Sequence, residues 1–126
     1  MTKTASPVFF TVCTRHTLVH ARALRASLSA HHPGARFVLV CADGTVPAGQ
    51  DADVALSLDR LGMDGLAQMR ARYTPAQLRA ALKPFVFAHL FADGAARVIY
   101  LDPTGFVLGP MQEALERLGR DADAIL

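Results

Sequence analysis

The chain has 126 residues, the usual size of one compact domain, and is too short for two ordinary domains. Hydrophobic residues make up 52% and charged residues 19%, a balance that buries enough apolar surface to offset chain entropy and so excludes a disordered chain. The net charge of +2 is spread without a basic run, which argues against nucleic acid or an anionic membrane surface as a partner. We therefore expect residues 1–126 to form a single domain.

The sequence shows no signal for export or membrane insertion. No stretch approaches the roughly 18 uncharged apolar residues of a membrane-spanning helix, and no cleavage pattern follows the apolar run of residues 7–13. The two cysteines, Cys13 and Cys41, are too few for a disulfide framework and have apolar neighbours, which favours buried, reduced thiols. These features predict a cytoplasmic protein without a transmembrane segment.

The first third of the chain predicts a strand, a helix and a second strand. Residues 8–13 and 37–41 are nearly continuous apolar runs, typical of strands covered on both faces. Between them, residues 17–32 have apolar positions every three or four residues, which predicts an amphipathic helix that ends at Pro33-Gly34. Its inner face is expected to hold Leu18, Ala21, Leu24 and Leu28. This unit predicts an α/β fold with an open, mainly parallel, Rossmann-like sheet and flanking helices.

The middle of the chain predicts a loop, a short strand and helical pieces. Residues 43–52 are rich in turn formers, and residues 53–57 suggest a short edge strand. Residues 59–82 have a helical pattern in pieces, one of them with Thr74-Pro75 as its cap and first position. Pro84 is expected to open a separate helix over residues 85–91.

The last part of the chain predicts a strand, a turn and a helix. Residues 97–101 favour a strand that runs into Asp102-Pro103-Thr104-Gly105, and Pro110 begins a helix that ends near Gly119. The inner face of this helix is expected to hold Met111, Ala114, Leu115 and Leu118. The final residues 123–126 resemble the opening of another strand, which predicts that the chain is incomplete at its C-terminus.

Ligands of open α/β sheets sit beyond the carboxyl ends of the strands, and three polar segments are predicted there: residues 14–17, 42–44 and 102–105. The first opens a helix, whose N-terminus favours an anion such as a phosphate. No phosphate-loop or dinucleotide glycine motif is present in the sequence. His16 and His20 have the spacing of two metal ligands on a helix, but without a third ligand ordinary surface histidines are favoured.

Five segments, taken in order, resemble one family. They are Thr11-Val12-Cys13-Thr14, residues 21–28, residues 32–37, Ala81-Leu82-Lys83-Pro84-Phe85 and Val98-Ile99-Tyr100-Leu101-Asp102-Pro103. Together they look like the N-terminal, nucleotide-sugar-binding portion of a bacterial glycosyltransferase of the GT-A fold, in the glycogenin and lipopolysaccharide hexosyltransferase group. The resemblance implies hexosyl transfer from a nucleoside diphosphate sugar to a saccharide or another acceptor.

The resemblance also implies a divalent cation, manganese or magnesium, held by an Asp-x-Asp pair on the diphosphate. Carboxylates at positions i and i+2 of an extended segment point the same way and can share one metal. Here the pair is Asp102 and Thr104, so a neutral hydroxyl replaces the second carboxylate and the motif is degenerate. The alternative is a plain turn, because Asp-Pro-x-Gly is a turn signature.

Further contacts follow from the same resemblance. It places the base and ribose beside the loop that contains Thr14, Arg15 and His16. Asp43 could accept a hydrogen bond from the ribose or base, although Asp-Gly is also a common turn. Lys83 could reach a phosphate or could be an ordinary solvated lysine.

The function predicted for the chain is that of the donor-binding half of a glycosyltransferase. The acceptor-binding portion and a further metal-ligating histidine of the family would follow its end, so catalysis by this chain alone is not expected. Two alternatives stay open: a non-catalytic remnant or binding module of the same fold, and an unrelated α/β nucleotide-binding domain. An unpaired sheet edge would favour self-association.

Overall fold

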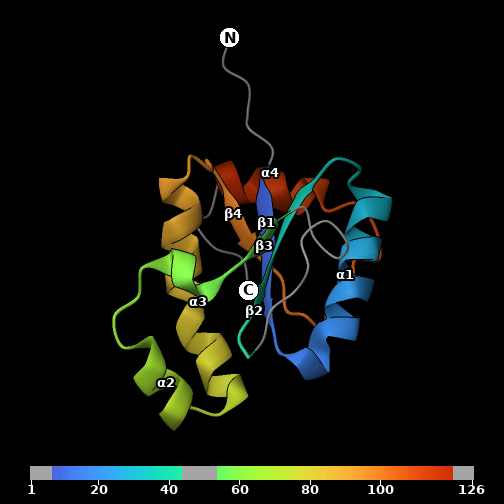
Figure 1. The fold of residues 1–126 in the computed structure, drawn as a ribbon. Helices are drawn as coiled ribbons and strands as arrows, with labels where there is room; N and C mark the ends of the chain where they lie inside the picture. The colour runs from blue at the N-terminus through green and yellow to red at the C-terminus, as the bar shows by residue number, and fades with distance from the viewer. Residues whose placement is uncertain (1–6, 44–53, 121–126) are drawn as a thin grey trace.

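The structure is a computed structural model, and it describes residues 7–43 and 54–120. Its centre is a four-stranded sheet in the order β3-β2-β1-β4, with every neighbouring pair parallel. The strands are β1 (Val8–Cys13), β2 (Arg36–Cys41), β3 (Val54–Leu56) and β4 (Val98–Tyr100). In Figure 1 the sheet stands between helices on its two faces. The predicted α/β class and the strands are therefore confirmed, including the edge position of β3.

The central strand β1 is buried along its whole length, as a strand covered on both faces must be. Its alternate side chains enter two separate cores: Phe10 and Val12 belong to one, and Phe9 and Cys13 to the other. The register pairs Cys13 with Cys41 at the carboxyl ends of β1 and β2. Both cysteines are free and buried, as predicted.

One face of the sheet is covered by α1 (Leu18–His31), which follows the short 3-10 helix η1 (Arg15–Thr17). The buried residues of α1 include Ala21, Leu24 and Leu28, which confirms most of its predicted inner face. The chain after β4 returns along the same face, since Val107 N–H donates to Ser27 Oγ at 2.9 Å and Met111 N–H donates to His32 Nε2 at 2.9 Å.

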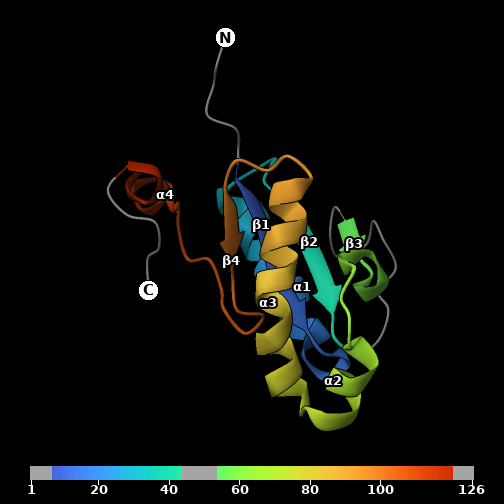
Figure 2. The same ribbon diagram turned by 90° about the vertical axis from the view of Figure 1, so that its left-hand side faces the viewer.

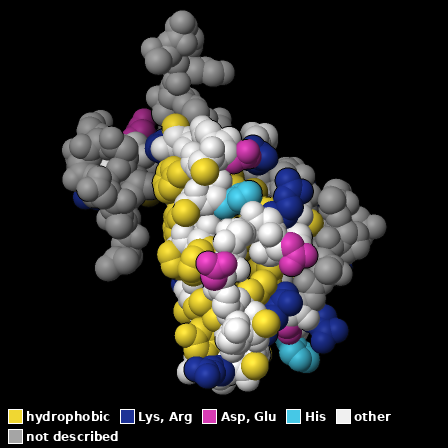
Figure 3. Space-filling view, turned by 60° about the vertical axis from the view of Figure 1, so that its left-hand side comes forward, with side chains coloured by type: hydrophobic (Ala, Val, Ile, Leu, Met, Phe, Trp, Pro, Cys, Tyr) yellow, Lys and Arg dark blue, Asp and Glu magenta, His cyan; other side chains and the backbone are white. Residues whose placement is uncertain are grey.

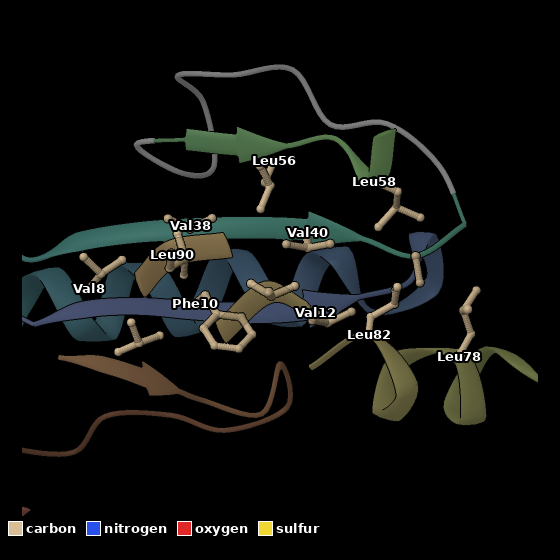
Figure 4. Packing of buried hydrophobic residues seen from close by; sticks show 13 residues of the cluster. Val8, Phe10, Val12, Val38, Val40, Leu56, Leu58, Leu78, Leu82 and Leu90 are labelled. Atoms are coloured by element: carbon tan, nitrogen blue, oxygen red, sulfur yellow. The ribbon is translucent and has the colours of Figure 1, made fainter. Parts of the chain in front are cut away.

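The other face is covered by η2 (Leu58–Leu61), α2 (Leu66–Arg72) and α3 (Pro75–Ala92). Figure 2 shows α3 running along the sheet beside β4, with α1 behind the strands. The buried residues of α3 recur every four positions and pack on the sheet (Figure 4); they are Leu78, Leu82, Val86 and Leu90.

The prediction that Pro84 opens a separate helix is wrong, because Pro84 lies inside the continuous helix α3. The helix begins instead at Pro75, where Thr74 Oγ1 accepts from Gln77 N–H and the Gln77 side chain accepts from Thr74 N–H. Pro84 is exposed, so its ring stands on the solvent side while the four-residue repeat of buried leucines and valine keeps α3 on the sheet.

Replacing Pro84 with alanine should stabilise the protein by about 1–2 kcal/mol, because the restored helical N–H donor and the removal of the ring's clash with the preceding turn outweigh the greater entropy that alanine gives the unfolded chain. Urea unfolding followed by circular dichroism measures this difference. The matched control is Pro75→Ala, because Pro75 lies in the first turn of α3, where its missing N–H breaks no helical bond. A lower unfolding midpoint for Pro84→Ala would contradict the prediction.

The last helix, α4 (Gln112–Arg120), begins two residues after the predicted start at Pro110. Leu115 is buried and Met111 packs on the α1 side of the sheet, but Ala114 is exposed, so its predicted inward position is wrong. The predicted loop over residues 43–52 lies outside the described residues except for Asp43, and so does the predicted strand opening at residues 123–126. Within the described part of the chain, no helix has the length and hydropathy that crossing a membrane requires.

β4 is an edge strand of the described sheet, so the backbone on its outer side has no neighbouring strand there. Figure 3 shows hydrophobic side chains along the adjacent face of the molecule. Among the exposed large hydrophobic residues, α3 contributes Phe85 and Phe91. Open edges and apolar patches favour association, and the predicted self-association stays a prediction.

Candidate functional site

The strand order places a switch point between β1 and β4. The chain passes from β1 to β2 and β3 on one side of the sheet, and then β4 pairs with β1 on the other side. In open parallel sheets of this order, ligands bind at the carboxyl ends of the two strands where the winding reverses. We call the region formed by residues 14–17, 79–83 and 100–105 the switch-point edge.

The loop after β1 is held by bonds between its own residues. Thr14 is buried, its N–H donates to Thr17 Oγ1 at 2.8 Å, and the two hydroxyl oxygens lie 3.2 Å apart. Arg15 and His16, by contrast, are exposed at the start of η1. Thr14 therefore shapes the loop, while the side chains of Arg15 and His16 are the ones open to a ligand.

Asp43 joins the carboxyl ends of β1 and β2. Its Oδ1 accepts a hydrogen bond from Arg15 N–H at 2.7 Å, and Cys41 Sγ lies 3.5 Å from the same oxygen. The carboxylate of Asp43 therefore lies at the first N–H of η1, where the helix dipole favours a negative charge. The structure brings Asp43 and Arg15 together as the sequence predicted, and it gives Asp43 a bond that positions the loop.

Asp43→Ala should lower stability by about 1–2 kcal/mol, because the Arg15 N–H loses a charged acceptor. Asp43→Asn keeps an acceptor oxygen and should lose less. Asp64→Ala, at an exposed loop residue, serves as the matched control for loss of one carboxylate. Equal unfolding midpoints for Asp43→Ala and Asp64→Ala in urea would show that the bond between the two strand ends contributes nothing.

The thiols of Cys13 and Cys41 interact at the end of the β1–β2 pair. A hydrogen bond to Cys41, together with burial, raises the pKa of Cys13 well above its usual range. A thiol with such a pKa is protonated at neutral pH and is a poor nucleophile. The same hydrogen bond lowers the pKa of Cys41, so this conclusion about protonation applies to Cys13 alone. Both thiols are buried, as the sequence predicted.

Asp102 closes a tight turn at the carboxyl end of β4. Its Oδ1 accepts from Thr104 N–H at 2.9 Å and from Thr104 Oγ1 at 2.6 Å, and Gly105 N–H donates to the Asp102 carbonyl at 2.8 Å. A Cβ on Gly105 would lie 3.0 Å from that carbonyl oxygen, so the turn favours glycine. The hydrogen bond from the Thr104 hydroxyl lowers the pKa of Asp102. The turn interpretation of Asp-Pro-Thr-Gly is confirmed, and a role for Asp102 and Thr104 as metal ligands stays a prediction.

Two cations of α3 lie beside this turn. Lys83 Nζ stands 4.2 Å from the centroid of the Tyr100 ring, a cation–π contact. Arg79 lies one helical turn before Lys83, and both positive charges act on Asp102 to lower the pKa of its carboxyl further. Burial raises the pKa of Tyr100, and the charge of Asp102 raises it as well.

Arg79 is the residue of this group that the sequence analysis missed. The available signal was its four-residue spacing from Lys83, which places the two side chains on the same face of a helix. Because the helical pieces predicted from the sequence end at residue 82, Lys83 lies outside them and the shared face does not emerge from the sequence.

Two open hollows lie elsewhere on the surface. One of about 430 Å³ is bordered by η2 and α2, and one of about 280 Å³ lies near Val8 and Gly94. Neither includes a residue of the switch-point edge. His16 and His20 are both exposed, and within residues 7–43 and 54–120 no three His, Cys, Asp or Glu side chains form a metal-binding group.

No known protein family, curated protein or solved structure matches this chain. The chain's resemblance to glycosyltransferases therefore depends on the quoted sequence segments alone, and the fold established by the structure is a parallel α/β sheet with flanking helices.

Proposed function

We propose that the switch-point edge binds a nucleoside diphosphate sugar, as the donor site of a GT-A-like glycosyltransferase. The observation that carries this proposal is the strand order β3-β2-β1-β4, which puts Arg15 and Asp102 at the reversal of winding, where Lys83 lies over Tyr100. Lys83 and Asp102 lie in segments that resemble that family, and Arg15 follows directly after another. The acceptor is a saccharide or another hydroxyl compound.

The residues have separate tasks in this proposal. The exposed side chains of Arg15 and His16 border the base and ribose. Asp43 fixes their loop through Arg15 N–H and leaves its second carboxylate oxygen for the ribose. Lys83, half-buried against Tyr100, faces the phosphates. This arrangement binds and orients a donor without a nucleophile from the protein.

Asp102 and Thr104 fit manganese or magnesium poorly. These ions prefer several charged oxygen ligands, whereas the pair offers one carboxylate, and Oδ1 of that carboxylate already accepts two hydrogen bonds. We therefore derive no step of the reaction through a cation.

The test is a titration of the isotope-labelled protein with uridine diphosphate glucose, followed by NMR of the backbone amides. We expect saturable shifts at residues 14–17, 79–83 and 100–105. Titrations with guanosine diphosphate mannose and adenosine diphosphate glucose examine the choice of base and sugar. Shifts centred on the hollow near Gly94, or no binding of any nucleotide sugar, would contradict the proposal. Equal binding of nucleotides with and without sugar would favour the alternative of a general nucleotide-binding domain.

A further inference from the structure

The side of α3 that faces β4 divides into an aromatic part and a cationic part. Residues 79, 83, 87 and 91 follow one another at four-residue intervals along one side of the helix. Phe87 stacks with Phe91 at 6.4 Å and meets the Phe10 ring edge-on at 4.9 Å. On the same side of α3, Lys83 comes next after Phe87 in the direction of the carboxyl end of β4, and Arg79 follows one helical turn further.

The contact with Tyr100 fixes the Lys83 ammonium at the carboxyl end of β4. The ammonium lies over the Tyr100 ring, which itself packs edge-on against Phe10 at 5.2 Å. Such packing holds a flexible lysine in one region and removes part of its water, which strengthens its attraction for an anion. Arg79 adds a planar guanidinium that can bind two phosphate oxygens at once.

The charges near the turn favour an anion. Arg79 and Lys83 are both cationic, whereas Asp102 is the one carboxylate of the turn, and one of its oxygens is already occupied by Thr104. A divalent cation in a donor site neutralises the charge on a diphosphate, and two basic side chains near the turn, one of them held over Tyr100, can supply the same neutralisation.

We infer that Arg79 and Lys83 bind the diphosphate of the donor directly, so that nucleoside diphosphate binding at the switch-point edge needs no divalent cation. The inference rests on the proposed function, because it concerns how the same site holds its ligand. It makes Arg79 and Lys83 binding residues and leaves Asp102 and Thr104 as the turn that positions β4's end.

The experiment is calorimetric titration with uridine diphosphate, once in EDTA and once in magnesium or manganese. We expect dissociation constants that agree within about twofold, since direct ion pairs supply the attraction. Arg79→Gln and Lys83→Gln should each weaken binding about tenfold in EDTA, the scale of one lost charged hydrogen bond. Uridine monophosphate should bind more weakly than uridine diphosphate, and either substitution should reduce its affinity by a smaller factor.

The matched control is Arg117→Gln, which removes the same charge from an exposed position on α4. It should leave the affinity unchanged, and Lys83→Arg should retain most of it. Binding that occurs only with magnesium or manganese would overturn the inference and leave the proposed function standing. Absence of diphosphate binding under every condition would overturn both. An equal loss in Arg117→Gln and Arg79→Gln would show general charge attraction and would also overturn the inference.

Discussion

Phe10→Ala is expected to lower the free energy of unfolding by about 3–5 kcal/mol, the usual cost of removing a large buried aromatic side chain. Phe10 is fully buried in the middle of β1. Its ring meets the edges of Phe87 at 4.9 Å and Tyr100 at 5.2 Å, so the substitution loses two aromatic contacts and leaves a cavity between the sheet and α3. Because domains of this size are stable by only about 5–15 kcal/mol, this loss is a large fraction of the total stability.

Urea unfolding followed by both circular dichroism and tyrosine fluorescence measures this loss. Phe106→Ala is the matched control, because Phe106 is 61% exposed and its removal should leave the midpoint nearly unchanged. Phe10→Leu keeps most of the apolar volume and should fall between the two. If Phe10→Ala and Phe106→Ala unfolded at the same urea concentration, the packing of α3 on the centre of the sheet would be refuted.

The strands and α1 were predictable because their local pattern and their tertiary environment agree. A continuous apolar run such as residues 8–13 has no polar face to expose, so it must lie between two layers. The spacing of Leu24 and Leu28 likewise matches the face that packs on the sheet. The edge strand β3 was also found, although it is short, because turn-forming residues precede it.

The helix boundary predicted at Pro84 is wrong because the packing of α3 on the sheet outweighs the local tendency of proline to end a helix. A proline usually ends a helix, but in α3 the buried positions Leu82 and Val86 continue the apolar repeat across it. Tertiary contacts on one side of the helix offset the missing hydrogen bond on the exposed side. The helix break predicted near Pro84 also kept Arg79 and Lys83 from being assigned together, because these two residues share a face only in a continuous helix.

The candidate site was predictable in position but not in its bonds. The carboxyl ends of parallel strands meet at one edge, so Arg15, Asp43 and Asp102 could be assigned there from sequence. The bond from Arg15 N–H to Asp43 depends on loop geometry, and so does the closed turn at Asp102. The return of residues 105–111 along α1 depends on hydrogen bonds to Ser27 and His32 and on the burial of Val107, and none of these leaves a periodic pattern in the sequence.

Thr104→Asp is expected to make ligand binding at the site depend more strongly on manganese than it does in the natural chain. The substitution removes the hydroxyl that donates to Asp102 Oδ1 at 2.6 Å and adds a second carboxylate two residues away. Two carboxylates at this spacing can share one divalent cation, so manganese affinity should rise at least about tenfold. In EDTA the added negative charge opposes that of Arg79 and Lys83, and uridine diphosphate should bind more weakly than to the natural chain.

Thr104→Asn is the control for this substitution, because it alters the same side chain without adding charge. Calorimetry with manganese alone and with uridine diphosphate, in manganese and in EDTA, separates the two effects. We expect Thr104→Asn to bind the diphosphate with little metal dependence, whereas manganese should restore or exceed the natural affinity in Thr104→Asp. A Thr104→Asp variant that binds manganese no better than Thr104→Asn would show that the Asp102 turn directs the new carboxylate away from Asp102. In that case the segment is a turn whose likeness to a metal-binding motif lies in its sequence alone.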